Sequence, residues 1–297
     1  MKRIFTYKIQ ENFNDYTVSL FLKEHKYTSN IIKHLKRMEN SILRNNEWVH
    51  VYDKIHTDDI LEIVLLEDSA SDNIVPTNLP IDIVYEDEDL LVVNKPANMP
   101  IHPSQGNYDN TLANAIAYYY TSQNEPFVYR CINRLDRDTT GLLIIAKNMY
   151  SASILSGMVK NREIHREYLA IASGKVPPEG TIIAPIARVS GSTIERCVNE
   201  INGEYACTHY KTLYSDANLS LVSLKLETGR THQIRVHMKY IGHPLLGDFL
   251  YNPEFSLIER QSLHSHKLSF VHPITGETLK FEAKLPEDMQ KLIPEYN

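Results

Sequence analysis

Short runs of aliphatic and β-branched residues follow one another after Pro80, and they constrain the fold of this chain most strongly. Leu142–Ala146 is apolar throughout and indicates a buried strand. Helices are expected at 108–120 and at 151–160, the second capped by Asn148 or Ser151. The sequence therefore predicts an α+β fold built on a large, mostly antiparallel mixed sheet flanked by helices. Further strands are expected at Ile83–Tyr85, Leu90–Val93, Tyr168–Ala172, Ala206–Tyr214, Leu219–Glu227 and Thr278–Ala283.

The first part of the chain, residues 1–68, is expected to form a small separate module. Two amphipathic helices are predicted there, one beginning at Val18 and one with apolar positions from Ile31 to Ile42. Two extended runs follow, Trp48–Val51 and Ile60–Leu65. Residues 69–80 lack periodicity and contain two prolines, so they are interpreted as a linker to a second domain, 81–297.

The composition is that of a soluble globular protein, with 42% hydrophobic and 23% charged residues. No apolar run approaches the roughly 20 residues that cross a bilayer, and the start of the chain has no signal-peptide pattern. Cys131, Cys197 and Cys207 form an odd set without paired spacing. Reduced thiols in a cytoplasmic protein are therefore expected.

The net charge of −6 argues against a nucleic-acid partner, but the charges are unevenly distributed. Six basic residues against two acidic ones lie between Lys23 and Arg44, and the second predicted helix carries three of them. No Lys or Arg lies between Lys54 and Lys95, where the acids 86–89 accumulate. A basic face on an acidic protein and scattered surface charge are both compatible with this pattern.

One polar stretch directly precedes the buried strand. Asp136 lies between Arg134 and Arg137, in a field that favours the ionised carboxylate. A carboxylate of this kind beside a cleft can act as a nucleophile. The alternative is that Asp136 or Asp138 only caps a turn formed by residues 139–141.

A second stretch, 228–237, is dense in hydrogen-bond donors. Thr231, Gln233 and Arg235 alternate with apolar residues and histidine, so in an extended segment they would face one side. Arg235 would then reach an anion or a carboxylate with two N–H groups. The alternative is an ordinary surface salt bridge.

Four blocks of the sequence, in the order in which they occur along the chain, resemble the RluA-like family of RNA pseudouridine synthases. The similarity spans roughly 81–289, and members of the family often carry an N-terminal alpha-L RNA-binding module, which residues 1–68 resemble weakly. That module usually has Asn-Gly where this chain has Asn46-Glu47, and Gly-Asp where it has Asp58-Asp59. The blocks are 94–103, 133–141, 166–170 and 229–237 with its continuation to 248.

The chain departs from the family pattern at a few positions. Asn133 stands where His is common and is the change most relevant to substrate handling. Thr140 replaces Ser and keeps the hydroxyl, and Arg166 replaces Lys and keeps the charge. Asn98 replaces a frequent Gly, and since Asn tolerates left-handed backbone angles, the turn is expected to survive.

The resemblance implies a cofactor-free enzyme that isomerises uridine to pseudouridine. Asp136 would be the nucleophile, Tyr168 would stack on the base, and Arg235 would pair with Asp136. Large-subunit ribosomal RNA is the expected substrate and transfer RNA the alternative. The residues expected to contact RNA are Arg134, Arg230 and His102, together with Lys33, Lys36 and Arg37 of the basic helix.

No metal is expected, because His232 and His237 are spaced for neither a helix face nor one side of a strand. A monomer without membrane contact is expected. Two other functions remain open: an RNA-binding ribosome-assembly factor without activity, and a sugar-cleaving hydrolase. The hydrolase would need a second carboxylate roughly 5–9 Å from the first.

Overall fold

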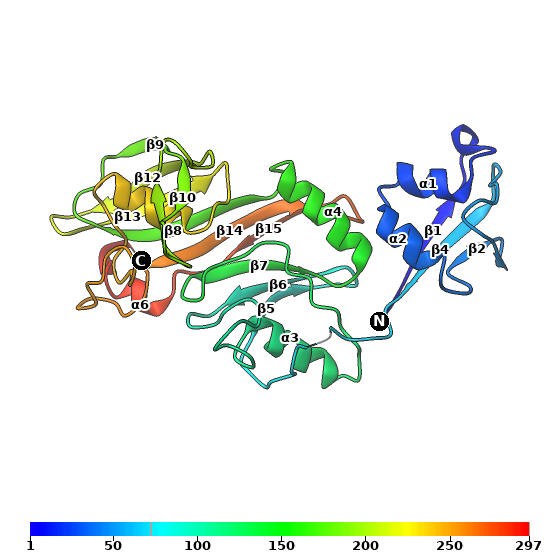
Figure 1. The fold of residues 1–297 in the computed structure, drawn as a ribbon, viewed down its shortest axis with the longest axis horizontal. Coiled ribbons are helices and arrows are strands. Elements are labelled where there is room, and N and C mark those ends of the chain that lie inside the picture. Colours follow the sequence, from blue (N-terminus) through cyan, green and yellow to red (C-terminus); the bar gives the residue numbers. More distant parts are fainter. Residues whose placement is uncertain (72, 297) are drawn as a thin grey trace.

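A nine-stranded mixed sheet forms the body of the molecule (Figure 1). The computed structural model describes residues 1–71 and 73–296. The strand order is β5-β6-β7-β14-β8-β13-β12-β9, with β15 paired to β14, and every pairing is antiparallel except that of β7 with β14. The predicted α+β fold with a mostly antiparallel mixed sheet is confirmed. The strands are β5 (Asp82–Glu86), β6 (Leu90–Lys95), β7 (Thr140–Ala146), β8 (His165–Ser173), β9 (Glu179–Ile183), β12 (Cys207–Ser215), β13 (Leu219–Leu226), β14 (Leu263–Val271) and β15 (Thr278–Glu282).

Helices cover both faces of the sheet around β7, and this explains why every residue of that strand is buried. Leu143 and Ile145 pack in the core that contains α3 and α5, whereas Leu142 and Ile144 pack in the core that contains α4. Successive strand residues point to opposite faces, so a strand covered on both sides is apolar throughout. The helices are α3 (Leu112–Thr121), α4 (Met149–Lys160), α5 (Gln233–Tyr240) and α6 (Glu287–Gln290).

Side-chain caps set where two of these helices begin. The side chain of Asn148 accepts the backbone N–H groups of Tyr150 and Ser151, so Asn148 is the N-cap of α4, one of the two predicted residues. Helix α3 begins four residues later than expected because Thr111 and Asn114 form a capping box. Among the described residues, no helix is long and apolar enough to cross a membrane.

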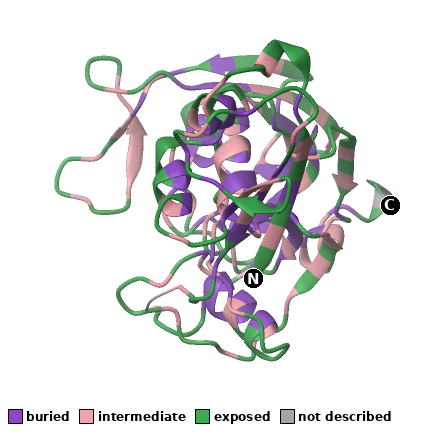
Figure 2. Cartoon of the chain, turned by 90° about the vertical axis from the view of Figure 1, so that its right-hand side faces the viewer, coloured by how far each residue is buried: buried purple, intermediate pink, exposed green. Residues whose placement is uncertain are grey.

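The N-terminal residues form a four-stranded sheet, ordered β1-β4-β2-β3, that packs on two short helices around a hydrophobic core, to which Tyr150 of α4 also contributes. Figure 2 views the molecule from the right-hand side of Figure 1, and there buried residues lie mainly in the interior while many of the outer loops are exposed. The elements are β1 (Lys2–Lys8), η1 (Glu11–Phe13), α1 (Val18–Glu24), α2 (Ser29–Leu35), β2 (Ile42–Arg44), β3 (Glu47–Trp48) and β4 (Ile60–Leu66); the remaining elements of the chain are β10 (Ile186–Arg188), β11 (Arg196–Val198) and η2 (Pro294–Tyr296).

The second helix is shorter than its apolar pattern predicted. Helix α2 ends at Leu35, where the Ser41 hydroxyl donates to the last turn's carbonyl at 2.6 Å, and Asn40 then adopts a φ of 55°. Ile42 therefore lies in β2. It packs in the same core as the apolar residues of α2, and for this reason its spacing from them looked helical in the sequence. Only Trp48 of the expected run 48–51 pairs in a strand, and β1 was not anticipated.

The N-terminal sheet is docked on the first turn of α4. The ring of Tyr150 stacks on Tyr27 at a centroid distance of 4.0 Å, and its hydroxyl donates to the carbonyl of His25 at 2.7 Å. Beside it, the guanidinium of Arg3 donates to both oxygens of the buried Asp89 at 3.0 and 2.9 Å. These contacts bury an aromatic ring and a charge pair between the two sheets, so they hold the sheets in one arrangement.

Residues 69–80 contain no helix or strand in their described part. The Ser71 hydroxyl accepts the N–H of Tyr129 at 2.8 Å, and Thr77 donates its N–H to the Asn114 carbonyl at 3.1 Å. Ile74 also packs against the core of the large sheet. The segment thus lies along the large sheet, while the domain boundaries at 68 and 80 remain a prediction.

Replacing Tyr150 by Ala tests the docking. The change removes a buried ring that two aromatic neighbours contact, so we expect a loss of about 3 kcal/mol or more in the free energy of unfolding. We also expect a single thermal transition to split in two, measured by differential scanning calorimetry. Tyr118→Ala, at an exposed site on α3, is the control and should stay within about 0.5 kcal/mol of the unmodified protein. An unsplit transition in Tyr150→Ala contradicts the docking role.

Candidate active site

Asp136 lies in the loop that leads into β7. The buried side chain of Lys95 holds this loop in place. The ammonium group of Lys95, 1% exposed, donates to the carbonyls of Pro96, Met99 and Arg137 at 2.7, 2.9 and 2.7 Å. Three carbonyls match the three N–H groups of a protonated lysine. Burial lowers the pKa of Lys95 to about 7, while the negative charges of Asp138 and Asp136 act in the opposite direction.

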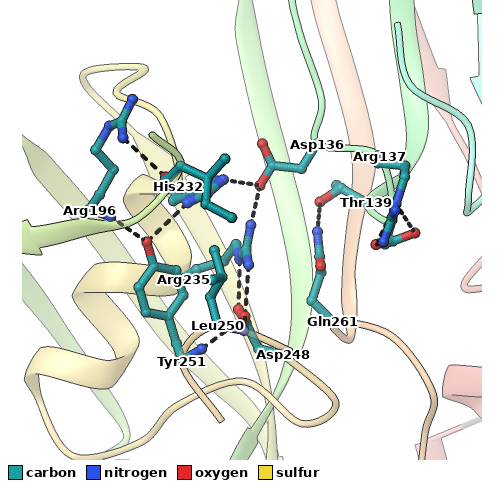
Figure 3. Close-up of polar contacts among 12 residues, drawn as sticks. Asp136, Arg137, Thr139, Arg196, His232, Arg235, Asp248, Leu250, Tyr251 and Gln261 are labelled. Atoms are coloured by element: carbon teal, nitrogen blue, oxygen red, sulfur yellow. Dashed lines mark hydrogen bonds and ion pairs between the residues drawn. The ribbon is translucent and has the colours of Figure 1, made fainter. Parts of the chain in front are cut away.

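The remainder of the loop is bonded to β14 and to the segment before it. The Thr139 hydroxyl accepts the side-chain amide of Gln261 at 3.1 Å, and Thr140 shares a 2.8 Å hydrogen bond with His264 (Figure 3 shows the first). Gly141 has a φ of 109°, and a Cβ at this position would collide with the backbone of Ser265. The Asp136 side chain is consequently presented by a loop with little freedom to move.

The Asp136 carboxylate does not cap the turn that follows it. Its Oδ2 accepts a hydrogen bond from Nη1 of Arg235 at 2.9 Å, across 99 positions of sequence. Within the described residues no hydrogen bond or ion pair reaches Oδ1, and the side chain is 19% exposed. One carboxylate oxygen is therefore held in place while the other is open to a reaction partner. Asp138 instead pairs with its neighbour Arg137 at 2.9 Å.

Arg235 is placed by a helix and not by an extended segment, so the expectation of alternating side chains in 231–235 was wrong. His232 takes a left-handed conformation with φ of 58°, and α5 starts at the next residue. The side-chain amide of Gln233 donates to the carbonyl of Cys207 and accepts from the hydroxyl of Thr228. Arg235 is the described residue of this helix that bonds Asp136.

A second carboxylate completes the ionic arrangement. Asp248, fully buried, accepts Nε and Nη2 of Arg235, each at 2.7 Å (Figure 3). Burial opposes the charge of Arg235, but the hydrogen bonds and charges of Asp248 and Asp136 outweigh it and raise the pKa of this arginine. Asp248 also accepts the N–H groups of Leu250 and Tyr251. A carboxylate so saturated and so buried cannot serve as the second acid that a hydrolase requires.

His232 adds a neutral ring to the site. Its Nε2 lies 3.8 Å from Oδ2 of Asp136, and its Nδ1 shares a 3.0 Å hydrogen bond with the hydroxyl of Tyr251. Burial lowers the pKa of His232 to about 4, although the charge of Asp136 acts to raise it. The imidazole is therefore uncharged near neutral pH and does not compete with Arg235 as the counter-ion.

Two cavities meet at Asp136. A small pocket of about 80 Å³ is lined by Tyr168 and Arg230, and a groove of about 830 Å³ is lined by His102, Ile194 and Phe249. Asp136, Arg134 and Arg235 line both. The structure thus brings the three predicted catalytic residues to one place, with Asp136 at the junction of a small pocket and a much larger one.

The residues expected to bind RNA fall into two groups. Arg134 and His102 are exposed along the groove, and Arg230 lines the small pocket while it pairs with Glu204. Lys33, Lys36 and Arg37 are exposed at the end of α2 in the N-terminal sheet and line neither cavity. Their expected roles remain predictions.

The positions that depart from the family pattern fit this structure. The Asn133 side chain is buried, and its oxygen accepts the N–H of Ile144 at 2.9 Å, whereas its Nδ2 has no hydrogen-bond partner among the described residues. Asn98 adopts a φ of 55°, which confirms that the turn uses a left-handed residue. Arg166 lines the small pocket.

Two clusters in the described part of the chain have donor sets that suit a metal ion. One is Cys207, His209 and Glu227; the other is Asp87, Asp89 and His272. In the first, the Arg162 guanidinium lies 3.6 Å from Glu227, and in the second, Asp89 is already bonded by Arg3 and by Asn148. Neither contains Asp136.

Comparison with known proteins decides the family. Residues 89–240 match the model of the RNA pseudouridylate synthase family. The chain belongs to this family. It is 40% identical over 278 residues to the "Uncharacterized RNA pseudouridine synthase YjbO" of Bacillus subtilis, with 93% of this chain and 98% of that protein covered. It is also 43% identical over 232 residues to the "Ribosomal large subunit pseudouridine synthase D" of Haemophilus ducreyi, with 73% and 71% covered.

Solved structures agree with the family. "Human RNA Pseudouridylate Synthase Domain Containing 1" superposes with a TM-score of 0.57 at 30% identity, covering 69% of this chain and 83% of that one. The second human structure, "Domain Containing 4" of the same series, gives 0.58 at 25% identity, covering 70% and 90%. The resemblance to RluA-like synthases is confirmed, and this protein is an RNA pseudouridine synthase, an isomerase.

Sequence reasoning missed three residues of the synthase's site. Asp248 and Lys95 lie inside blocks that the family resemblance used, but nothing local distinguishes an acid or a lysine that will be buried. His232 was considered only as a metal ligand. The available signal was their position in the blocks that resemble the family, but this position did not reveal what each side chain would contact.

The neutral state of His232 predicts a pH dependence of stability. Its pKa of about 4 in the folded protein lies below the value of about 6.5 in an unfolded chain. The resulting stabilisation is complete above pH 6.5 and is lost as the pH falls toward 4, because the unfolded chain then binds the extra proton.

We therefore expect His232→Gln to lose less stability between pH 6.5 and pH 4.5 than the unmodified synthase, measured by urea denaturation at both values. His56→Gln, at an exposed histidine, should leave that difference unchanged. An equal loss in His232→Gln and in the unmodified protein would show that His232 is not buried in its neutral form.

Proposed function

We propose that this synthase isomerises uridines of large-subunit ribosomal RNA, with Asp136 as the nucleophile. The observation that carries the proposal is the hydrogen bond from the buried Arg235 to Oδ2 of Asp136, which leaves Oδ1 without a partner among the described residues on a side chain that lines two cavities. A positioned and ionised carboxylate at a cavity junction is suited to nucleophilic attack. The substrate class is supported by relatives that are named as ribosomal large subunit pseudouridine synthases.

The reaction exchanges one bond of the nucleoside for another. The bond between ribose carbon-1′ and uracil nitrogen-1 breaks, the base turns, and a new bond forms between carbon-1′ and carbon-5. The proton on carbon-5 leaves, and nitrogen-1 ends protonated. Asp136 takes part either by attacking the uracil ring or by assisting departure of the base from ribose. In both routes the hydrogen bond from Arg235 orients the carboxylate.

Tyr168 is proposed to hold the base during this exchange. Its side chain is 4% exposed and lines the small pocket together with Asp136. A rigid aromatic ring offers a face on which a turning base can stack. The tyrosine hydroxyl is also a candidate acceptor for the carbon-5 proton.

The RNA is proposed to lie in the groove of about 830 Å³ that passes Asp136. Arg134 and His102 would contact its backbone there, and Arg230 would meet a phosphate at the small pocket. The target uridine must leave its helix or loop to enter, at a cost of about a few kcal/mol. Phosphate contacts by the N-terminal alpha-L-like module, through Lys33, Lys36 and Arg37, would offset part of this cost.

The Asp136→Asn variant tests the nucleophile. Asn keeps the shape of the side chain but cannot form the covalent bond, so we expect pseudouridine formation to fall below detection while RNA affinity stays nearly unchanged. Release of tritium from 5-tritiated uridine in bulk RNA measures the turnover. Asp109→Asn, at an exposed position outside the site, is the matched control and should retain activity.

Turnover by Asp136→Asn would exclude the nucleophile assignment, and a complete lack of turnover by the unmodified protein would favour an inactive assembly factor. The substrate is identified by mapping pseudouridines in a deletion strain. Sites lost from large-subunit ribosomal RNA support the proposal, whereas sites lost only from transfer RNA contradict it.

The RNA anchor on α2 is tested by exchanging Lys33, Lys36 and Arg37 for Ala together. Each phosphate contact that is lost should flatten the plot of log affinity against log salt by about 0.7–0.9 units. We expect a flatter slope and a higher KM, with a smaller change in kcat, because these residues line neither cavity at Asp136. Lys284→Ala, an exposed lysine elsewhere, is the control. A slope equal to that of the unmodified synthase would exclude the anchor.

A further inference from the structure

The N-terminal sheet carries a row of exposed aromatic side chains that the reaction does not use. Along 48–52, Val49 and Val51 are buried at 6% and 4%, whereas Trp48 is 46% exposed and Tyr52 is 69% exposed. His50 between them is exposed as well. Residues 51–52 form a turn, closed by the hydrogen bond from the N–H of Asp53 to the carbonyl of His50 at 3.0 Å. The valines therefore anchor the segment in the core, while the three rings are exposed beside them.

These three rings, Trp48, His50 and Tyr52, are here called the aromatic row. Trp48 and His50 are 4.9 Å apart between ring centroids, and His50 and Tyr52 are 5.1 Å apart with an angle of 21° between their planes. The last two rings are thus stacked. Because the row is not covered by other described side chains, its outer ring faces are open to a planar ligand.

The backbone holds the aromatic row in place. The N–H of Val49 donates to the carbonyl of Ile42 at 3.0 Å, and the carbonyl of Val51 accepts the N–H of Ser19 at 2.7 Å. The N–H of His50 donates to the carboxylate of Asp53 at 2.7 Å. A ligand that stacks on rings already ordered loses less conformational entropy on binding.

Positive charge lies beside the row. A hollow of about 220 Å³ separates the row from the end of α2, and Lys36 lines it. Lys33 and Arg37 are exposed on the same helix end, and none of these three cations forms an ion pair with a described residue. Of the nearby acids, Asp53 is engaged by the His50 N–H, and Glu47 is exposed next to Trp48.

We propose that the aromatic row binds unpaired nucleobases of the RNA substrate by stacking, while the cations at the end of α2 contact the adjoining phosphates. Single-stranded nucleic acid is bound by this combination of ring faces and positive charge, and stacking works with any base because every base has a π face. The inference rests on the proposed anchor role of the N-terminal module, and it names single-stranded RNA next to the target as the partner.

Trp48 is the single tryptophan of the chain, so the intrinsic tryptophan fluorescence of the protein reports on the aromatic row directly. The full-length synthase is titrated with an eight-nucleotide oligouridylate, and tryptophan fluorescence is recorded at fixed salt. We expect saturable quenching, because a stacked base lies against the indole. A blunt RNA duplex of the same length has no unpaired bases and should quench less at equal occupancy. Bound oligouridylate without any change in Trp48 fluorescence would overturn the proposal.

Variants separate stacking from charge. Tyr52→Ala should weaken oligouridylate binding roughly 5- to 100-fold, since one stacked base is lost, and Tyr52→Phe should restore most of the affinity. The slope of log affinity against log salt should not change in Tyr52→Ala, because no phosphate contact is removed. Tyr118→Ala, at an exposed tyrosine on α3, is the control and should bind like the unmodified protein.

The outcomes distinguish this inference from the anchor on which it rests. If Tyr52→Ala and Trp48→Leu bind as the unmodified synthase does while the triple change on α2 flattens the salt slope, the anchor stands and the aromatic row is excluded. If no N-terminal change affects binding, both fail. Fluorescence that changes with protein concentration in the absence of RNA would show that the row contacts a second copy of this chain, and that result also overturns the proposal.

Discussion

The buried guanidinium of Arg235 between Asp136 and Asp248 is the interaction on which the site depends. A charge removed from water is costly unless it is paired and hydrogen-bonded, and breaking one partner of such a group costs about 3–5 kcal/mol. Asp248 carries most of that compensation, with two bonds to the arginine and two to the backbone. Arg235 can therefore stay buried and charged while only one oxygen of Asp136 is occupied.

The sheet supplies the rigidity that this arrangement needs. β7 is covered by helices on both faces, and the loop before it is tied to the ammonium of Lys95 and to the segment that leads into β14. Asp136 and Arg235 approach from a loop and a helix that are far apart in sequence. A small displacement of either element would open their 2.9 Å hydrogen bond. The orientation of the carboxylate therefore depends on the tight packing of the core that holds both elements.

The N-terminal sheet is held against the large sheet by contacts of its own. Stacking of Tyr150 on Tyr27 and the pairing of Arg3 with Asp89 join the sheet to α4. The cations of α2 and the aromatic row thus have a set position relative to Asp136, although the chain that connects the two sheets contains no helix or strand in its described part. With the proposed RNA contacts on this sheet and Asp136 as the proposed nucleophile, a fixed separation would favour uridines at a matching distance from an unpaired segment.

The sequence by itself determined what depends on local pattern: the apolar strand β7, the two candidate caps Asn148 and Ser151, the left-handed turn at Asn98, and the family, because several ordered blocks together carry the resemblance. It did not determine the length of α2, the helical state of the segment that carries Arg235, or the partners of Lys95 and Asp248. Local spacing reports which face of an element is apolar. Whether a charge is buried, and what compensates it, depends on residues brought together from distant positions, so only the tertiary structure decided these contacts.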